Sequence, residues 1–238
     1  MLTAAMQSES GVASGIALVV YDPQRPIPNR LVGAAFVDGA GAVLLHAMGL
    51  VPAAGAIEAM RQAHTVAARA VLGGPLCDAD DPRYVRDGGP YWSGPECGWL
   101  TSEYTDLIAD PEEPATLLAD YLNAKALLIP RAAWHATGEF DDRFGTHLAD
   151  VDWCLRARRA GFECRLMPGA RFLVRKAQWL PNEPSEAERL RSMLLLAAKH
   201  GVPCTLASLT YVLIILNVVC IYCYLRTTEK MPLAAGHD

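Results

Sequence analysis

The sequence predicts an α/β domain followed by one membrane-spanning helix, and three observations lead to this fold class. Short apolar runs alternate along the chain with segments in which apolar residues recur at helical spacing. Of the 238 residues, 52% are hydrophobic and 20% are charged, a composition that suits a folded domain and excludes a largely disordered chain. An uncharged, strongly apolar run lies at 205–225, close to the C-terminal end.

The first half of the chain is predicted to contain three strands and one helix. The strands are the apolar runs at 15–22, 31–37 and 42–49. A helix is predicted over 53–72 because apolar residues recur there at helical spacing, and His64 is interpreted as an ordinary residue on its face.

The segment 73–116 is rich in Gly, Pro and Asp and is too long for a simple connection. It is interpreted as a binding loop or a packed excursion from the domain. Trp92 and Trp99 lie in it, and they are candidate contacts for an acceptor or for a protein partner.

The second half continues the alternation. A strand is predicted at 126–129, and Pro130 begins a short helix. The next helix, 151–159, is opened by Asp150 and ended by Gly161. A strand pair follows around Pro168. A capping box then starts an amphipathic helix, whose apolar face is predicted to carry Leu190, Met193, Leu194 and Ala197.

Charge and cysteine usage narrow the class of protein further. The net charge of −5 argues against a nucleic-acid partner, which needs a concentrated basic surface. The seven cysteines show no framework spacing, and the single CxxC at 220–223 has no second pair to complete a zinc site. They are interpreted as free thiols in a reducing compartment. The N-terminal segment lacks the basic region of a signal or transit peptide.

The run 205–225 is long enough to span a bilayer, and it ends in two tyrosines that fit an aromatic belt. Asn217 within it can hydrogen-bond to another helix in lipid, so it is a candidate partner contact. The predicted organisation is an α/β domain, an amphipathic helix with a linker, a transmembrane helix and a short tail, at 1–180, 181–203, 204–225 and 226–238. This corresponds to a single-pass protein anchored in membrane lipid by its C-terminal end.

Residues 121–174 carry a more specific pattern of an apolar strand, a helix that begins with Arg, and a series of spaced motif residues. These are Gly138-Glu-Phe140-Asp141, Phe144, Asp150-Val-Asp152, Leu155-Arg156, Gly161 and Pro168-Gly-Ala170. In order and spacing the pattern resembles the family-2 glycosyltransferases, especially their rhamnosyltransferase-like branch. The upstream segment 43–63 more weakly resembles the family's strand, metal motif and helix.

The resemblance implies a GT-A-like fold, the fold of nucleotide-diphospho-sugar transferases. Enzymes of this family transfer a sugar from a nucleotide donor to an acceptor hydroxyl. A divalent cation, Mn or Mg, neutralises the diphosphate leaving group, and a carboxylate base takes the hydroxyl proton. Asp150 matches the position of the base, and Asp152 follows it in the same motif.

The chain departs from the family pattern at three positions. Gly49 stands where the metal-motif aspartate is expected, Ala149 where a glutamate precedes the base, and Val174 where many members have a histidine. His46 or Asp38 is the candidate replacement, but Mg prefers oxygen ligands over a lone imidazole. No metal site and no cofactor are therefore predicted, and the donor side of the domain is interpreted as truncated.

Asp150 accordingly has two interpretations, a catalytic base or the N-cap of a helix whose first turn also holds the Asp152–Arg156 pair. The leading hypothesis is a non-catalytic accessory or structural subunit of a membrane complex, which contacts other subunits through the transmembrane helix and the 73–116 loop. The mitochondrial inner membrane is one hypothesis for its host. The alternative is an active membrane-anchored glycosyltransferase with Asp150 as base. A third hypothesis is a glycan-binding module that uses Trp92, Trp99 and Asp150 without turnover.

Overall fold

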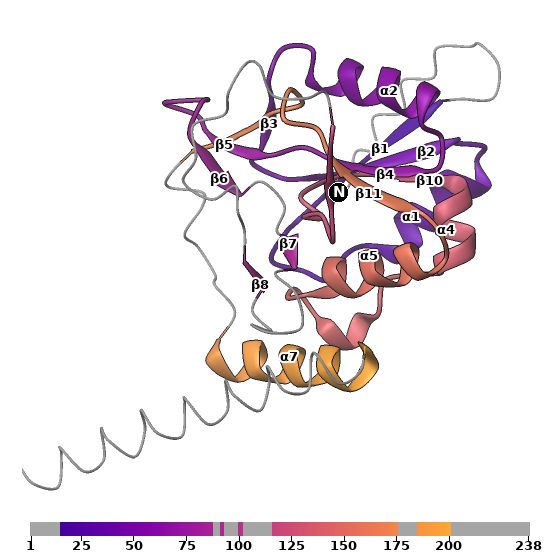
Figure 1. The fold of residues 1–238 in the computed structure, drawn as a ribbon, viewed down its shortest axis with the longest axis vertical. Coiled ribbons are helices and arrows are strands. Elements are labelled where there is room, and N and C mark those ends of the chain that lie inside the picture. The colour runs from indigo at the N-terminus through magenta and orange to yellow at the C-terminus, as the bar shows by residue number, and fades with distance from the viewer. Residues whose placement is uncertain (1–14, 88–90, 93–99, 102–115, 176–184, 201–238) are drawn as a thin grey trace, which may run out of the picture.

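The computed structural model describes residues 15–87, 91–92, 100–101, 116–175 and 185–200. Within these residues a mixed six-stranded sheet forms the centre of the domain (Figure 1). Its strands, in spatial order, are β1 (Ile16–Tyr21), β2 (Ala42–Ala47), β10 (Ala126–Pro130), β4 (Ala70–Gly73), β11 (Glu163–Leu166) and β9 (Leu117–Ala119). The pairs β1–β2 and β4–β11 are parallel, whereas β10 is antiparallel to both of its neighbours.

Two smaller sheets accompany the central one in the described part of the chain. The first has the order β3 (Val51–Pro52), β12 (Phe172–Val174), β5 (Leu76–Asp78) and β6 (Val85–Asp87). The second pairs β7 (Tyr91–Trp92) with β8 (Leu100–Thr101). Four of these strands belong to the segment 73–116, so this segment contributes sheet structure to the domain.

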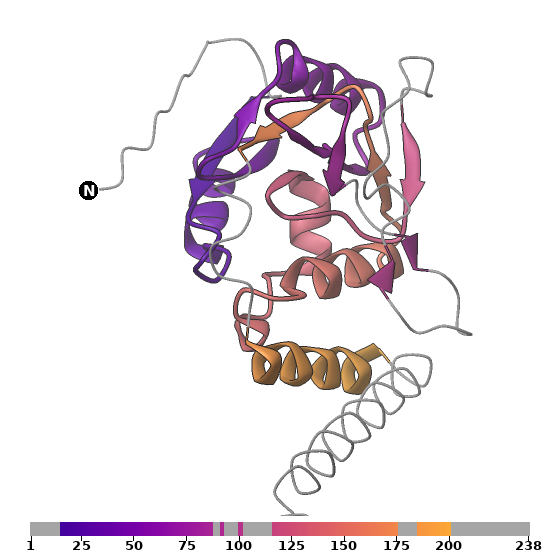
Figure 2. The same ribbon diagram turned by 90° about the vertical axis from the view of Figure 1, so that its left-hand side faces the viewer.

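Helices cover both faces of the central sheet, as Figure 1 shows. On one face lie α1 (Asn29–Val37), α4 (Arg131–Thr137) and α5 (Ala149–Arg159), and on the other lies α2 (Ala56–Val66). The 3-10 helix η1 (Asp142–Phe144) connects α4 to α5, and α7 (Glu186–His200) lies beneath this helical layer (Figure 2).

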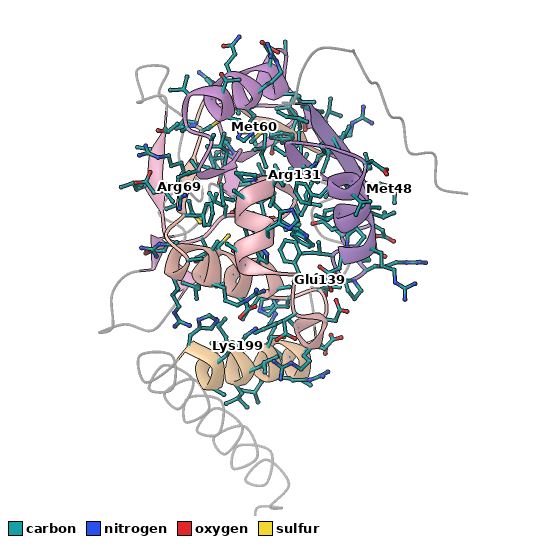
Figure 3. All side chains as sticks on the ribbon, turned by 90° about the vertical axis from the view of Figure 1, so that its right-hand side faces the viewer. Met48, Met60, Arg69, Arg131, Glu139 and Lys199 are labelled. Atoms are coloured by element: carbon teal, nitrogen blue, oxygen red, sulfur yellow. The ribbon has the colours of Figure 1, made fainter. Side chains whose placement is uncertain are left out.

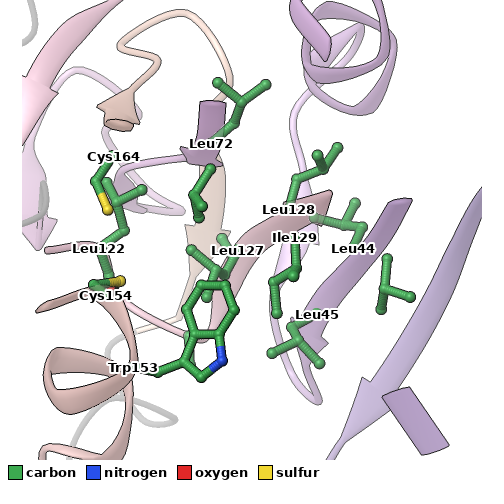
Figure 4. Packing of buried hydrophobic residues seen from close by; sticks show 14 of the residues in the cluster. Leu44, Leu45, Leu72, Leu122, Leu127, Leu128, Ile129, Trp153, Cys154 and Cys164 are labelled. Atoms are coloured by element: carbon green, nitrogen blue, oxygen red, sulfur yellow. Dashed lines mark hydrogen bonds between the residues drawn. The ribbon is translucent and has the colours of Figure 1, made fainter. Parts of the chain in front are cut away.

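The core is a cluster of buried residues from the central sheet and from α1, α2, α4 and α5. Figure 4 shows the indole of Trp153, from α5, beside Leu127 and Ile129 of β10. Trp153 is fully buried, and its Nε1 donates a hydrogen bond of 2.8 Å to the carbonyl oxygen of Gly138. The hydrophobic burial of an aromatic side chain of this size stabilises the attachment of α5 to the sheet.

The predicted strand at 31–37 is wrong, because this segment lies in α1. Its small residues tolerate a helix, and Val32 and Phe36, one helical turn apart, are both buried toward the core. The predicted helix at 53–72 is confirmed only as far as Val66, since 70–73 form β4 at the centre of the sheet. The strands flanking Pro168 exist but do not pair with each other, since they belong to different sheets.

The capping box of α7 is confirmed: Ser185 Oγ accepts a hydrogen bond of 3.3 Å from the amide of Glu188. The apolar face predicted for this helix is partly wrong. Leu194 is 45% exposed, whereas Ser192 and Leu196 are buried. The predicted span at 204–225, with Asn217, lies outside the described residues, and no helix within those residues is long and apolar enough to cross a membrane.

Candidate functional site

Asp150 and Asp152 lie in the first turn of α5 and face different surroundings. An α-helix turns by about 100° per residue, so side chains two positions apart leave it in nearly opposite directions. Asp150 faces the segment that leads into β10, and Asp152 faces α7. The two motif aspartates are therefore expected to have different roles.

Asp150 is not the N-cap of α5. The N-cap residue is Leu148, in the left-handed region at φ 66°, and no side chain caps this end. The Oδ1 atom of Asp150 accepts a hydrogen bond of 2.9 Å from the amide of Val151, and Oδ2 accepts one of 3.0 Å from the amide of Ala124. The carboxylate is thus tied to the end of the central sheet, and the residue as a whole is half-buried.

The surroundings of Asp150 are polar groups that the sequence pattern did not single out. Burial raises the pKa of Asp150; the two backbone amides lower it, the charge of Asp87 raises it, and that of Lys125 lowers it, with a net rise. Tyr21, at the end of β1, and Tyr121 are buried nearby, and the pKa of each phenol is raised by burial and then by the charge of Asp150. A raised pKa makes the ionised carboxylate a stronger base than that of an ordinary aspartate.

Asp152 is a structural residue of the fold. It is fully buried, and it accepts hydrogen bonds from Arg156 Nε at 2.9 Å, Lys199 Nζ at 2.9 Å and His200 Nε2 at 2.8 Å. Lys199 also lies 2.9 Å from Asp141 Oδ2, which extends the contact to η1. Figure 3 labels Lys199 on the side of α7 that faces the domain.

The electrostatics of Asp152 agree with this role. Burial raises the pKa of Asp152. The hydrogen bonds from His200 and Lys199 and the charge of Arg156 together lower it by more, so the net shift is downward. The carboxylate therefore stays ionised and paired. No sequence motif singles out Lys199 or His200 as partners of Asp152.

The residues at the family's metal motif do not fit a divalent cation. Gly49 has no side chain, and Val174 is buried in β12. His46 is buried near the end of β2, and neither of its ring nitrogens has a hydrogen-bond partner. Asp38 precedes the start of β2, and the strand rise places His46 about 13 Å beyond that start, so these two residues cannot share an ion. No group of three potential metal ligands exists among the described residues.

The structure does not bring the predicted site residues together, since Asp150 and Asp152 face different partners. Trp92 contributes its main chain to β7, opposite Leu100. Trp99 and Asn217 lie outside the described residues, so their contact roles stay predictions. The group that surrounds Asp150 comes from three separate parts of the chain, the ends of β1 and β6 and the segment before β10.

The described residues form a mixed α/β fold, and the chain is similar in sequence to a glycosyltransferase. The chain is related in sequence to an N-acetylglucosaminyl-diphospho-decaprenol L-rhamnosyltransferase of Mycobacterium tuberculosis, found in strains CDC 1551 / Oshkosh and ATCC 25618 / H37Rv. The two are 28% identical over 165 residues, which cover 62% of this chain and 52% of the relative. The chain thus spans about half the length of the curated relatives it matches, and no family model matches it.

Two solved structures show partial likeness to the fold. A crystal structure of GalNAc-T7 with UDP, GalNAc and Mn2+ aligns with a TM-score of 0.45 and 11% identity, covering 61% of this chain and 29% of that one. The structure of A197 from STIV aligns with a TM-score of 0.37 and 9% identity, covering 60% of this chain and 61% of that one. Support for the glycosyltransferase relationship comes from the sequence similarity.

Proposed function

We propose that this domain acts in glycosyl transfer to a sugar hydroxyl, with Asp150 as the base that takes the hydroxyl proton. One observation carries the proposal: at the motif position of the family's base stands a half-buried aspartate whose carboxylate is fixed by two backbone amides. The neighbouring Asp152 is fully buried and paired with side chains of α5 and α7. Asp150 is therefore the motif carboxylate with surface left for a ligand.

The chemistry at Asp150 is a proton transfer coupled to displacement. The acceptor oxygen forms a bond to the anomeric carbon of the donor sugar, and the bond from that carbon to the nucleoside diphosphate breaks. The diphosphate leaves with the electron pair, and the hydroxyl proton moves to Asp150. The raised pKa of Asp150 supports this role, since a base is most effective when its pKa lies near the working pH.

The proposed acceptor is a sugar carried on a lipid diphosphate. The name of the mycobacterial relative states such an acceptor, and the predicted span at 205–225 would hold the domain at the membrane where lipid-linked sugars reside. Because the described residues at the metal motif do not fit a cation, no step of the proposal passes through a metal.

The test is transfer of a labelled sugar from nucleotide sugars to N-acetylglucosaminyl-diphospho-lipid by the full chain in detergent. Wild type and Asp81→Asn are expected to transfer, and Asp150→Asn is not. Asp81 is the matched control because it is an exposed aspartate paired with Arg83 in a loop. Absence of transfer by a wild-type protein that melts cooperatively would contradict the proposal.

A second candidate function is a non-catalytic subunit of a membrane complex, joined to its partners through the span and the 73–116 segment. The observation that favours it is Gly49 at the position of the metal-motif aspartate. Under this hypothesis the chain transfers no sugar and co-purifies with other membrane proteins in mild detergent. Recovery of the chain as a free monomer would weigh against it.

A further inference from the structure

The strongest unexplained feature near Asp150 is Asp87, the last residue of β6. Asp87 Oδ2 accepts a hydrogen bond of 2.6 Å from Nδ2 of Asn123. The main-chain amide of the next residue, Ala124, donates to Oδ2 of Asp150 at 3.0 Å. Two carboxylates from distant parts of the chain are therefore held by donors on adjacent residues.

Asn123 also shapes the turn that carries the Ala124 amide. Its Oδ1 accepts a hydrogen bond of 2.9 Å from the amide of Lys125, which closes a side-chain turn two residues long. The Nδ2 atom of the same side chain is bound to Asp87, so both ends of the Asn123 amide group are engaged. The direction of the Ala124 N–H, and with it the position of Asp150, depends on this arrangement.

We propose that Asp87 is a positioning residue for Asp150, acting through Asn123 and the main-chain amide of Ala124. This inference rests on the proposed function of Asp150 as a base. Asp87 has two separable effects. Its oxygen orients the 123–125 turn, and its negative charge makes ionisation of Asp150 less favourable.

The charged and titratable groups that face Asp150 come from several elements. They are Asp87 of β6, Lys125 and Tyr121 from the segment before β10, Tyr21 of β1 and Cys154 of α5. The negative charge of Asp87 raises the pKa of Asp150, and the positive charge of Lys125 lowers it. Removal of the Asp87 charge therefore lowers the pKa of Asp150.

Three variants separate the two effects. Asp87→Asn removes the charge but retains an oxygen that can accept from Asn123, so the pKa of Asp150 falls and the plateau rate changes little. Asn123→Ala keeps the charge of Asp87 and removes the orienting bonds. Asp87→Ala removes both. In the last two variants kcat is expected to fall by about tenfold to a hundredfold with an unchanged acceptor KM, as for a misplaced catalytic group.

The measurements are the pH dependence of transfer and the titration of the Asp150 carboxyl carbon by NMR. In Asp87→Asn the acid limb of the rate profile and the Asp150 midpoint both move to lower pH, because Asp150 then loses its proton more easily. Asp81→Asn is the control and moves neither. The NMR titration does not require activity. A wild-type protein that transfers no sugar contradicts the proposed function, but the titration midpoint of Asp150 still tests the role of Asp87. An unchanged Asp150 midpoint in Asp87→Asn overturns it, as does an Asn123→Ala enzyme with wild-type kcat.

Discussion

Two aspartates of one helical turn differ in their burial and in the groups that they contact. Asp150 is half-buried, and two backbone amides hold its carboxylate in place. Asp152 is enclosed by three cationic or imidazole donors and has no exposed surface. The division follows from their opposite directions on α5.

Asp150→Asn is expected to lower the rate of transfer by about 10² to 10⁴, the usual contribution of a general base. The amide of asparagine cannot take the hydroxyl proton. Steady-state kinetics with the lipid-linked acceptor measure the loss, and a melting curve of the variant shows whether it is folded. A variant that retains the wild-type rate would remove Asp150 from the mechanism.

Asp152→Asn is expected to destabilise the domain by about 3 to 5 kcal/mol at pH 7, since it removes a buried carboxylate from the partly buried side chains of Arg156 and Lys199 and from the buried ring of His200. Asp81→Asn, in an exposed ion pair, is expected to cost under about 1 kcal/mol. Urea unfolding at several pH values measures both free energies.

The sign of the pH dependence follows from the lowered pKa of Asp152. Its stabilisation is present above the unfolded-state pKa of about 3.9 and is lost as the pH falls through the lower folded-state pKa. The difference between wild type and Asp152→Asn should therefore be largest at neutral pH and shrink in acid. A difference that is the same at pH 7 and pH 3 would show that Asp152 acts by packing alone.

At the scale of elements, α7 is attached to the domain by charge as much as by apolar contact. Leu196 and Ser192 are buried, and Lys199 joins Asp152 of α5 to Asp141 beside η1. The pKa of Asp141 is lowered by Arg143 against the effect of burial, and Lys199 lowers it further. The helix is thus fixed at its C-terminal end.

Lys199→Ala is expected to loosen α7 while the rest of the domain keeps its protection. Charge-assisted hydrogen bonds are worth about 1.5 to 3 kcal/mol each, so amide exchange in α7 should accelerate by about tenfold or more. Hydrogen exchange with mass spectrometry measures this, and Arg191→Ala, on an exposed position of the same helix, is the control. Equal exchange in Lys199→Ala and Arg191→Ala would mean that the ion pairs do not hold the helix.

At the scale of the whole molecule, the sequence predicts the elements around α5 best. The strand at 126–129, the helix at 151–159 and the glycine at 161 each carry a strong local signal, and all three are confirmed. The apolar run at 31–37 predicts a strand, but the same run suits a helix. Only its packing against β1 and β2 decides for a helix.

The candidate site is harder to predict, because its residues are far apart in the sequence and come together only in the folded domain. Asp87 and Asn123 lie in segments without a motif, and their link to Asp150 depends on the placement of β6 beside the start of β10. The partners of Asp152 on α7 are likewise distant in the sequence. Local patterns identify Asp150, but long-range contacts determine what it does.

Removal of metal ions tests whether transfer by the domain depends on a divalent cation. Gly49 and Val174 stand at the motif positions, and Asp38 precedes the start of β2 whereas His46 lies near its end. Transfer is therefore expected to be unchanged by EDTA and by added Mn. The transfer assay with and without chelator measures this. Loss of transfer on chelation, with recovery on adding Mn, would show a cation site that those four residues do not form.

The most direct measurement is the NMR titration of the Asp150 and Asp152 carboxyl carbons in the wild-type domain, with and without N-acetylglucosaminyl-diphospho-lipid. The expected result is a midpoint for Asp150 above the ordinary aspartate pKa of about 3.9 and a midpoint for Asp152 below it. The acceptor should then perturb Asp150 and leave Asp152 unchanged. Two similar midpoints, or an acceptor that perturbs Asp152 alone, would contradict the assignment of Asp150 to the ligand and Asp152 to the fold.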